Sequence, residues 1–169
     1  ICNEATYEKV KETTDLFGNF AAPDDVYLTL RGLRTLSVRM NRQHKNGIKI
    51  AKWLEAHPLV KKVMHPALES DRGHHIWRRD FTGAASLFGF IISETDQIKV
   101  AAFLDGMNLF GMGSSWGGYE SLLIPTFPNE NRSVTKWEPD GQTMRIHVGL
   151  EDPEDLIADL ENGLRRLST

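Results

Sequence analysis

Apolar side chains recur every three or four residues near the start of the chain, which is the spacing of an amphipathic helix. Residues 4–19 place Tyr7, Val10 and Phe17 on one face of such a helix. Gly18 lies where this pattern stops, and glycine commonly ends helices. The pattern therefore predicts a first helix over residues 4–19.

A second helical pattern begins at Pro23 and continues to about residue 56, where His57 and Pro58 interrupt it. Two carboxylates follow Pro23, and acids in a first turn complement the positive end of the helix dipole. Taken as one element, the stretch is longer than most globular helices, with Gly32 and Gly47 marking where it could kink. We expect a helix of the kind that crosses between two domains.

Short runs of β-branched and aromatic residues then alternate with helical patterns. The pattern predicts strands over residues 60–65, 84–93 and 144–148, helices over 95–105 and 153–167, an irregular segment over 66–82, a glycine-rich stretch over 111–122 and a proline-rich loop after it. Few, short strands interspersed with helices indicate an α+β fold, in which helices cover a small and mainly antiparallel sheet.

Composition narrows the functional classes. The chain of 169 residues has 20 Lys and Arg against 23 Asp and Glu, a net charge of −3 that argues against nucleic-acid binding. The single Cys2 excludes an internal disulfide framework and a multi-cysteine zinc site. No apolar run is long enough for a membrane span, and no secretory signal precedes residue 20, so we expect a cytoplasmic protein. The first residue is Ile rather than Met, and we expect a piece of a longer polypeptide.

The glycine-rich turn at residues 113–121 is the first candidate site. Gly117 and Gly118 permit positive φ angles and a close approach of the backbone to a ligand. Ser114 and Ser115 offer polar groups beside Trp116. On spacing alone, a plain tight turn around a buried tryptophan explains the same residues.

The strand at residues 144–148 is the second candidate. Alternation places Met144, Ile146 and Val148 on one face, and Arg145 and His147 on the other. If the first face is core, Arg145 points away from it, and its planar guanidinium suits a carboxylate. The alternative is an exposed arginine that pairs with a nearby acid.

Two other patterns carry no site. The six histidines form no ligand set, and the adjacent His74 and His75 stand among arginines, so we expect no metal centre. Residues 133–136 have the form S-x-T-K, but the segment lies in the proline-rich loop, and we interpret it as a chance match.

Four segments stand out, which read YLTLRGLRTLSVRM at 27–40, GHHIWRRDFTG at 73–83, SWGGYESL at 115–122 and RIHVGLEDPEDLIADL at 145–160. In this order they resemble the Cys/Met-metabolism family of enzymes that depend on pyridoxal phosphate (PLP). The resemblance extends over essentially the whole chain. The second segment, Trp116 and His147 are most similar to the carbon–sulfur β-lyase branch.

The resemblance implies the C-terminal domain of a fold-type I PLP enzyme. Residues 1–33 would form the tail of the large PLP-binding domain, and residues 34–169 the small C-terminal domain. The family's PLP lysine precedes the segment that matches Ile1, so the resemblance implies no catalytic or cofactor-binding residue here and no covalently bound PLP on this chain.

The resemblance does assign a substrate site. Arg145 matches the arginine that binds the substrate α-carboxylate, Ser115 the serine that assists it, and Trp116 the neighbouring wall of the pocket. Ser114 departs from the tyrosine that is common at its position in β-lyases. The implied reaction of the whole enzyme is cleavage of cystathionine to homocysteine, pyruvate and ammonia.

Two alternatives stay open at this point. A γ-synthase or γ-lyase of the same family would use the same arginine, and a module without catalytic function would have lost the other half of the enzyme. The expected partners are an amino-acid substrate and further copies of the chain in a homo-tetramer, with neither nucleic acid nor membrane.

Overall fold

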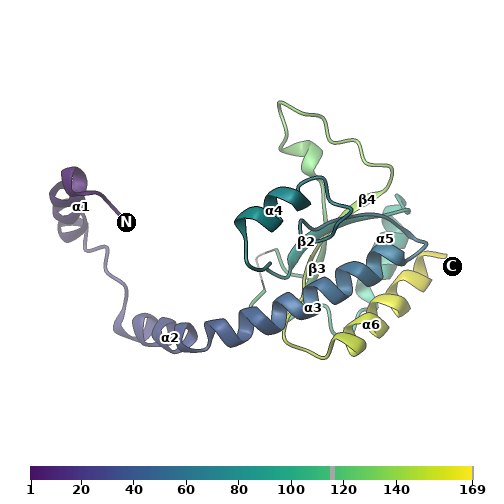
Figure 1. Cartoon of the computed structure of the whole chain (residues 1–169), viewed down its shortest axis with the longest axis horizontal. Helices are drawn as coiled ribbons and strands as arrows, with labels where there is room; N and C mark the ends of the chain where they lie inside the picture. Colours follow the sequence, from purple (N-terminus) through teal and green to yellow (C-terminus); the bar gives the residue numbers. More distant parts are fainter. Residues whose placement is uncertain (115–116, 169) are drawn as a thin grey trace. The chain divides into compact units, whose positions relative to one another are not determined.

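A computed structural model describes residues 1–114 and 117–168 of the chain. It divides into two compact units, residues 1–37 and residues 38–169. Helices α1 (Glu4–Phe17) and α2 (Pro23–Arg34) form the first unit, and helix α3 (Leu36–Ala56) begins at its end. The elements of the second unit are β1 (Val60–Met64), α4 (His74–Asp80), β2 (Leu87–Ile92), α5 (Gln97–Asp105), β3 (Leu122–Thr126), the 3-10 turn η1 (Pro128–Glu130), β4 (Gln142–His147), α6 (Pro153–Arg165) and the 3-10 turn η2 (Arg166–Ser168) (Figure 1).

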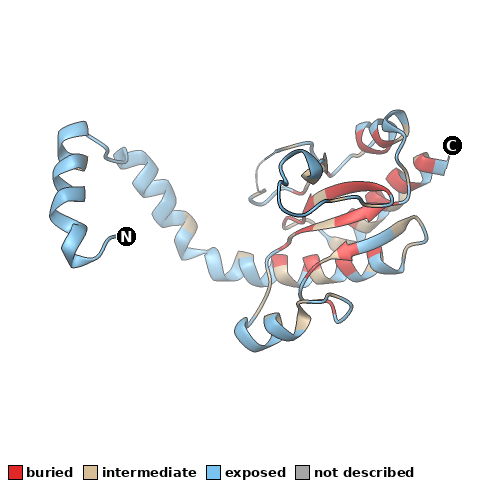
Figure 2. Cartoon of the chain, turned by 90° about the horizontal axis from the view of Figure 1, so that it is seen from above, coloured by how far each residue is buried: buried red, intermediate tan, exposed pale blue. Residues whose placement is uncertain are grey.

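The first unit consists of two helices without a buried core. The side chain of Asn3 accepts a hydrogen bond from the Thr6 amide at the start of α1, and Gly18 ends this helix with a φ of 64°. The helix predicted over residues 4–19 is thereby confirmed. Neither α1 nor α2 contains a buried residue, as the pale helices of Figure 2 show.

The single long helix predicted from Pro23 to residue 56 is wrong, because it breaks at Thr35. The Thr35 amide and hydroxyl both donate to the Gly32 carbonyl, at 3.2 and 3.3 Å. A threonine side chain that bonds to the backbone in this way competes with regular helical hydrogen bonding. The predicted end before His57 is confirmed.

A four-stranded antiparallel sheet in the order β1-β2-β4-β3 organises the second unit. The α+β class and the mainly antiparallel sheet predicted from the sequence are confirmed. Strand β3 was predicted as part of a proline-rich loop, and that prediction is wrong. Pro125 pairs with Met144 in an edge strand, where a residue without an amide hydrogen is tolerated.

Helix α4 also corrects the prediction, which left residues 66–82 irregular. The helix has 7 residues, too few to show a helical period. A side-chain contact joins it to the segment that follows, since the Trp77 indole donates to the Gly83 carbonyl at 3.1 Å.

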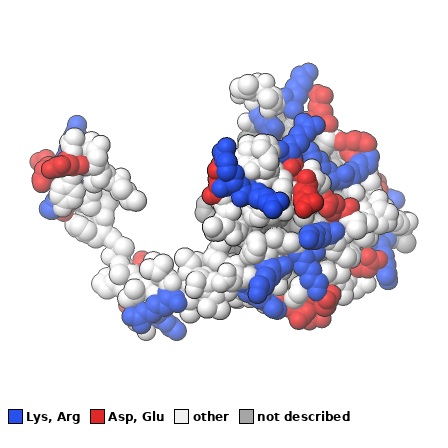
Figure 3. Space-filling view, in the orientation of Figure 1, with Lys and Arg blue, Asp and Glu red and all other residues white. Residues whose placement is uncertain are grey.

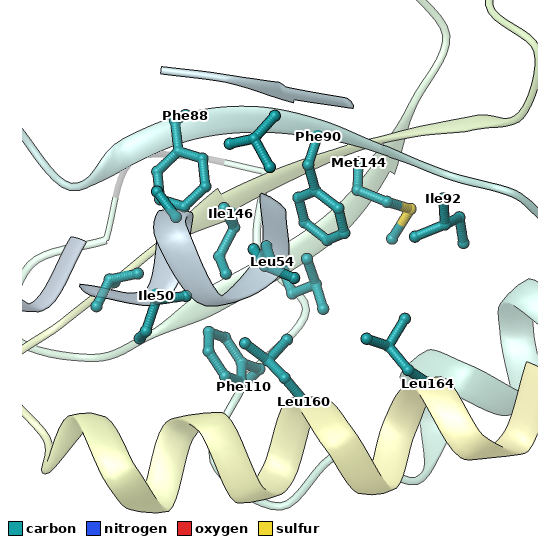
Figure 4. Packing of buried hydrophobic residues seen from close by; sticks show 14 of the residues in the cluster. Ile50, Leu54, Phe88, Phe90, Ile92, Phe110, Met144, Ile146, Leu160 and Leu164 are labelled. Carbon is teal, nitrogen blue, oxygen red and sulfur yellow. The ribbon is translucent and has the colours of Figure 1, made fainter. Parts of the chain in front are cut away.

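The hydrophobic core lies between one face of the sheet and helices α3, α5 and α6. Figure 4 shows Phe90, Met144 and Ile146 of the sheet directed towards Leu54 of α3 and Leu160 of α6. The opposite face, which we call the outer face, carries the side chains of Arg145 and Thr143. On the face seen in Figure 3, basic and acidic side chains are intermixed over the second unit.

Candidate functional site

Strand β4 supplies the central residue of the site through strict alternation. Met144, Ile146 and Val148 have exposed fractions of 0%, so their face is core. Arg145 is half-buried on the outer face. The predicted alternation of this strand is therefore confirmed.

Arg145 lies on a central strand, with a neighbouring residue on each side. In the sheet register it stands between Gly89 of β2 and Ile124 of β3. Gly89 has no side chain, and the Met64 methyl group occupies part of the space that a Cβ would fill. The guanidinium of Arg145 donates through Nη2 to the carbonyl of Ser114. This bond joins the strand to the beginning of the glycine-rich turn.

A cavity of about 350 Å³ opens at Arg145 on the outer face. Its wall is mostly apolar and includes Met64, Leu87, Trp137 and Thr143, and none of its lining residues is acidic. Within the described chain, Arg145 forms no ion pair, so the alternative of an arginine matched to a surface acid finds no support there. A guanidinium at such a wall can bind a carboxylate in a bidentate manner.

His147 follows Arg145 on the same face and is 7% exposed. Its Nε2 lies 3.4 Å from the carbonyl of Gly118, and its buried Nδ1 has no partner among the described residues. Burial lowers the pKa of His147, while the contact with Gly118 and the charge of Glu151 raise it to a lesser extent. The imidazole is therefore held towards its neutral form.

This pKa direction predicts how stability depends on pH. The unfolded chain binds a proton at His147 near pH 6.5, whereas the folded chain does so only at lower pH. We expect the free energy of unfolding to decrease as the pH falls below about 6.5. Burial also lowers the pKa of His65, so both histidines contribute with the same sign.

Urea unfolding at pH 7.5, 6.5 and 5.5 measures this dependence, since most carboxylates are still ionised over that range. His147→Gln is expected to flatten the slope without abolishing it, because His65 remains. A chain that becomes more stable on acidification would contradict the assignment.

At Gly117 the backbone of the glycine-rich turn packs closely against neighbouring residues rather than leaving space for a ligand. A Cβ at Gly117 would lie 2.2 Å from Cδ2 of His147 and 2.6 Å from the Glu120 carbonyl oxygen. Gly118 does not use the positive φ that glycine permits. Gly117 is thus needed for close packing on His147.

Polar groups from two other elements hold this turn. The carboxylate of Glu151 accepts hydrogen bonds from the Ser121 amide and hydroxyl at 2.8 and 2.9 Å. Gln43 of α3 donates to the Gly118 carbonyl at 2.6 Å, and Asn46 donates to the Glu151 carbonyl at 3.0 Å. The sequence analysis missed these residues. The available signal was their spacing, since Gln43 and Asn46 continue at intervals of three and four residues to Ile50 and Leu54.

Ser115 and Trp116, the other two predicted substrate-binding residues, lie outside the described residues. Lys136 of the S-x-T-K segment is exposed and lies 4.0 Å from Glu138, so it lacks the burial that activates a lysine amine. Within residues 1–114 and 117–168, no group of three His, Cys, Asp or Glu side chains could hold a metal ion. The helices of the same described part are all too short or too polar to cross a membrane.

Comparison with known proteins gives consistent matches. The family model for the Cys/Met metabolism PLP-dependent enzymes matches residues 1–165. Over 171 residues the chain is 43% identical to the cystathionine beta-lyase of Escherichia coli K12, covering 99% of this chain and 43% of that protein. Human cystathionine gamma-lyase is 36% identical over 167 residues, which is 96% of this chain and 41% of that protein.

A solved structure shares the fold. The cystathionine gamma synthase of Xanthomonas oryzae pv. oryzae, solved in complex with aminoacrylate and cysteine, superposes with a TM-score of 0.83 at 30% identity. The match covers 98% of this chain and 44% of that one. The chain therefore spans less than half the length of the relatives that it matches.

Proposed function

Because the chain belongs to the Cys/Met metabolism family of PLP-dependent enzymes, we propose that it is the C-terminal part of a carbon–sulfur β-lyase. The whole enzyme would cleave cystathionine to homocysteine, pyruvate and ammonia. This chain would contribute the site for the substrate's α-carboxylate, with Arg145 as its cation. The half-buried, acid-free position of Arg145 is the observation that carries this assignment.

The chain's own residues fit the substrate carboxylate rather than the cofactor. PLP enzymes hold their cofactor through a lysine amine, and no lysine lines the cavity at Arg145. Eight of the nine lysines are exposed, and the ninth, Lys99, forms an ion pair with Glu94 at 3.9 Å. We therefore assign no residue of this chain to PLP, which supplies the electron-withdrawing chemistry of the family.

The contribution of this chain is orientation. A bidentate contact with Arg145 fixes the carboxylate and with it the direction of the bonds at the substrate Cα. The mostly apolar wall beside it strengthens the electrostatic attraction by excluding water. Ser115 and Trp116 would complete the site next to Ser114, whose carbonyl already binds the guanidinium.

The first unit is proposed to belong to the large domain. We place residues 1–33 in the tail of that domain and residues 34–169 in the small domain. The helices α1 and α2 support this division, because side chains such as Tyr7, Phe17 and Leu33 are exposed here and would pack against the remainder of a larger domain. A cytoplasmic homo-tetramer is the assembly that we propose for the full-length enzyme.

The products of the full-length enzyme test the specific activity. A β-lyase releases pyruvate from cystathionine, whereas a γ-lyase releases 2-oxobutyrate. We expect pyruvate as the dominant oxoacid, together with one equivalent of homocysteine. Detection of 2-oxobutyrate in its place would assign the chain to the γ-cleaving branch, to which human cystathionine gamma-lyase belongs by its name. If neither pyruvate nor 2-oxobutyrate is formed, the module without catalytic function is favoured.

A further inference from the structure

A second arginine, Arg132, also lines the cavity at Arg145. Arg132 comes from the loop between β3 and β4, which the sequence analysis left without a function. Arg145 approaches the same cavity from the sheet. Two cations thus share one cavity whose lining includes no acid.

A chain of contacts holds Arg132 over the outer face. Its guanidinium carbon lies 4.8 Å from the centroid of the Trp137 ring, which is within the range of a cation–π contact. The Trp137 indole donates to the Thr143 hydroxyl at 3.0 Å. Thr143 precedes Arg145 by two residues on β4, so both side chains stand on the same face of the strand.

Two of the three acids of the same loop pair with lysines, and the third, Glu130, is exposed and does not line the cavity. Glu138 lies 4.0 Å from Lys136, and Asp140 pairs with Lys61 of β1. In the part of the chain that the structure describes, no carboxylate forms an ion pair with Arg132 or Arg145. The cavity therefore keeps two positive charges that a ligand can neutralise.

We infer that Arg132 binds a second carboxylate of the substrate, and that the two arginines select amino acids with a carboxylate at each end. This inference rests on the proposed function, in which Arg145 binds the α-carboxylate. A ligand with one carboxylate leaves the second guanidinium without a counter-charge, whereas a diacidic ligand pairs with both. The pairing adds charge-assisted hydrogen bonds only for the diacidic substrate.

The experiment compares two substrates in the full-length holoenzyme. Cystathionine carries a carboxylate at each end, and S-ethyl-L-cysteine carries only the α-carboxylate. For Arg132→Gln we expect kcat/KM on cystathionine to fall about tenfold, the usual worth of a hydrogen bond between charged groups, mainly through KM. On S-ethyl-L-cysteine we expect a change of less than about twofold, because the lost contact is absent there. Arg132→Lys keeps the charge and should recover part of the loss.

A matched control is Arg165→Gln, which removes an exposed arginine that pairs with Glu161 on α6 at 3.0 Å. It should change neither substrate's kinetics. An equal loss on both substrates for Arg132→Gln would show that the loop acts structurally and would overturn the inference. Unchanged kinetics on both would also overturn it. The proposed function stands or falls separately, because it requires Arg145→Ala to impair both substrates.

Discussion

Replacing Arg145 by alanine in the full-length enzyme is expected to lower kcat/KM on cystathionine at least about 30-fold, or about 2 kcal/mol of transition-state stabilisation. The reason is the position of the guanidinium on the outer face of β4. It is half-buried and forms no ion pair among the described residues, so its charge is available to the substrate. Removing the partner of a desolvated carboxylate typically costs about 2–5 kcal/mol.

Steady-state kinetics with pyruvate as the detected product measure this effect. Arg145→Lys keeps the positive charge but loses the planar fork, and it should fall between the wild type and Arg145→Ala. The exposed Arg165→Ala serves as the matched control and should stay within about twofold of the wild type. Near-normal kcat/KM for Arg145→Ala would refute the carboxylate site.

Replacing Phe90 by alanine is expected to lower the free energy of unfolding of the chain by about 3–5 kcal/mol. The Phe90 ring is 0% exposed and comes from β2, one of the two central strands. It lies within the cluster that includes Met144 of β4 and Leu54 of α3 (Figure 4). Its loss removes apolar contacts and leaves a cavity between the sheet and the helices.

Urea unfolding followed by circular dichroism measures the change. Because small domains are stable by only about 5–15 kcal/mol, the midpoint should move markedly to lower urea. Val134→Ala is the control, since this residue is 94% exposed in the loop between β3 and β4 and should change stability by less than about 0.5 kcal/mol. A loss below about 1 kcal/mol for Phe90→Ala would contradict the packing of the core around this ring.

The two substitutions act on opposite faces of the same pair of strands. In the register of the sheet Phe90 pairs with Met144, and the neighbouring pair is Gly89 with Arg145. The packing of Phe90 therefore helps to hold β4, the strand from which the Arg145 guanidinium projects. We expect Phe90→Ala to impair folding first, and Arg145→Ala to impair kinetics in a folded protein.

Local patterns were sufficient where apolar side chains recur at the period of the element. Alternation along β4 predicted that Arg145 stands opposite Met144 and Ile146, because a strand reverses its side chains at every residue. The C-terminal end of α1 was predicted because Gly18 readily adopts the left-handed conformation that ends a helix.

Local patterns failed where an element is too short to show a period or where distant residues decide the structure. Helix α4 has only 7 residues and is an example of the first kind. Strand β3 contains Pro125 and pairs with β4 along the sheet edge, which no local rule foretells. The role of Gly117 likewise required its contact with His147 on another strand.

The sequence by itself determined the α+β class, the face on which Arg145 lies and, through its ordered motifs, the enzyme family. These properties follow from the periodicity of side chains and from residue identity, both of which are local. Only the tertiary structure decided that Arg132 joins Arg145 at one cavity and that Glu151 holds the glycine-rich turn. Both arrangements bring together residues from different segments, and their geometry depends on how the sheet and its loops pack together.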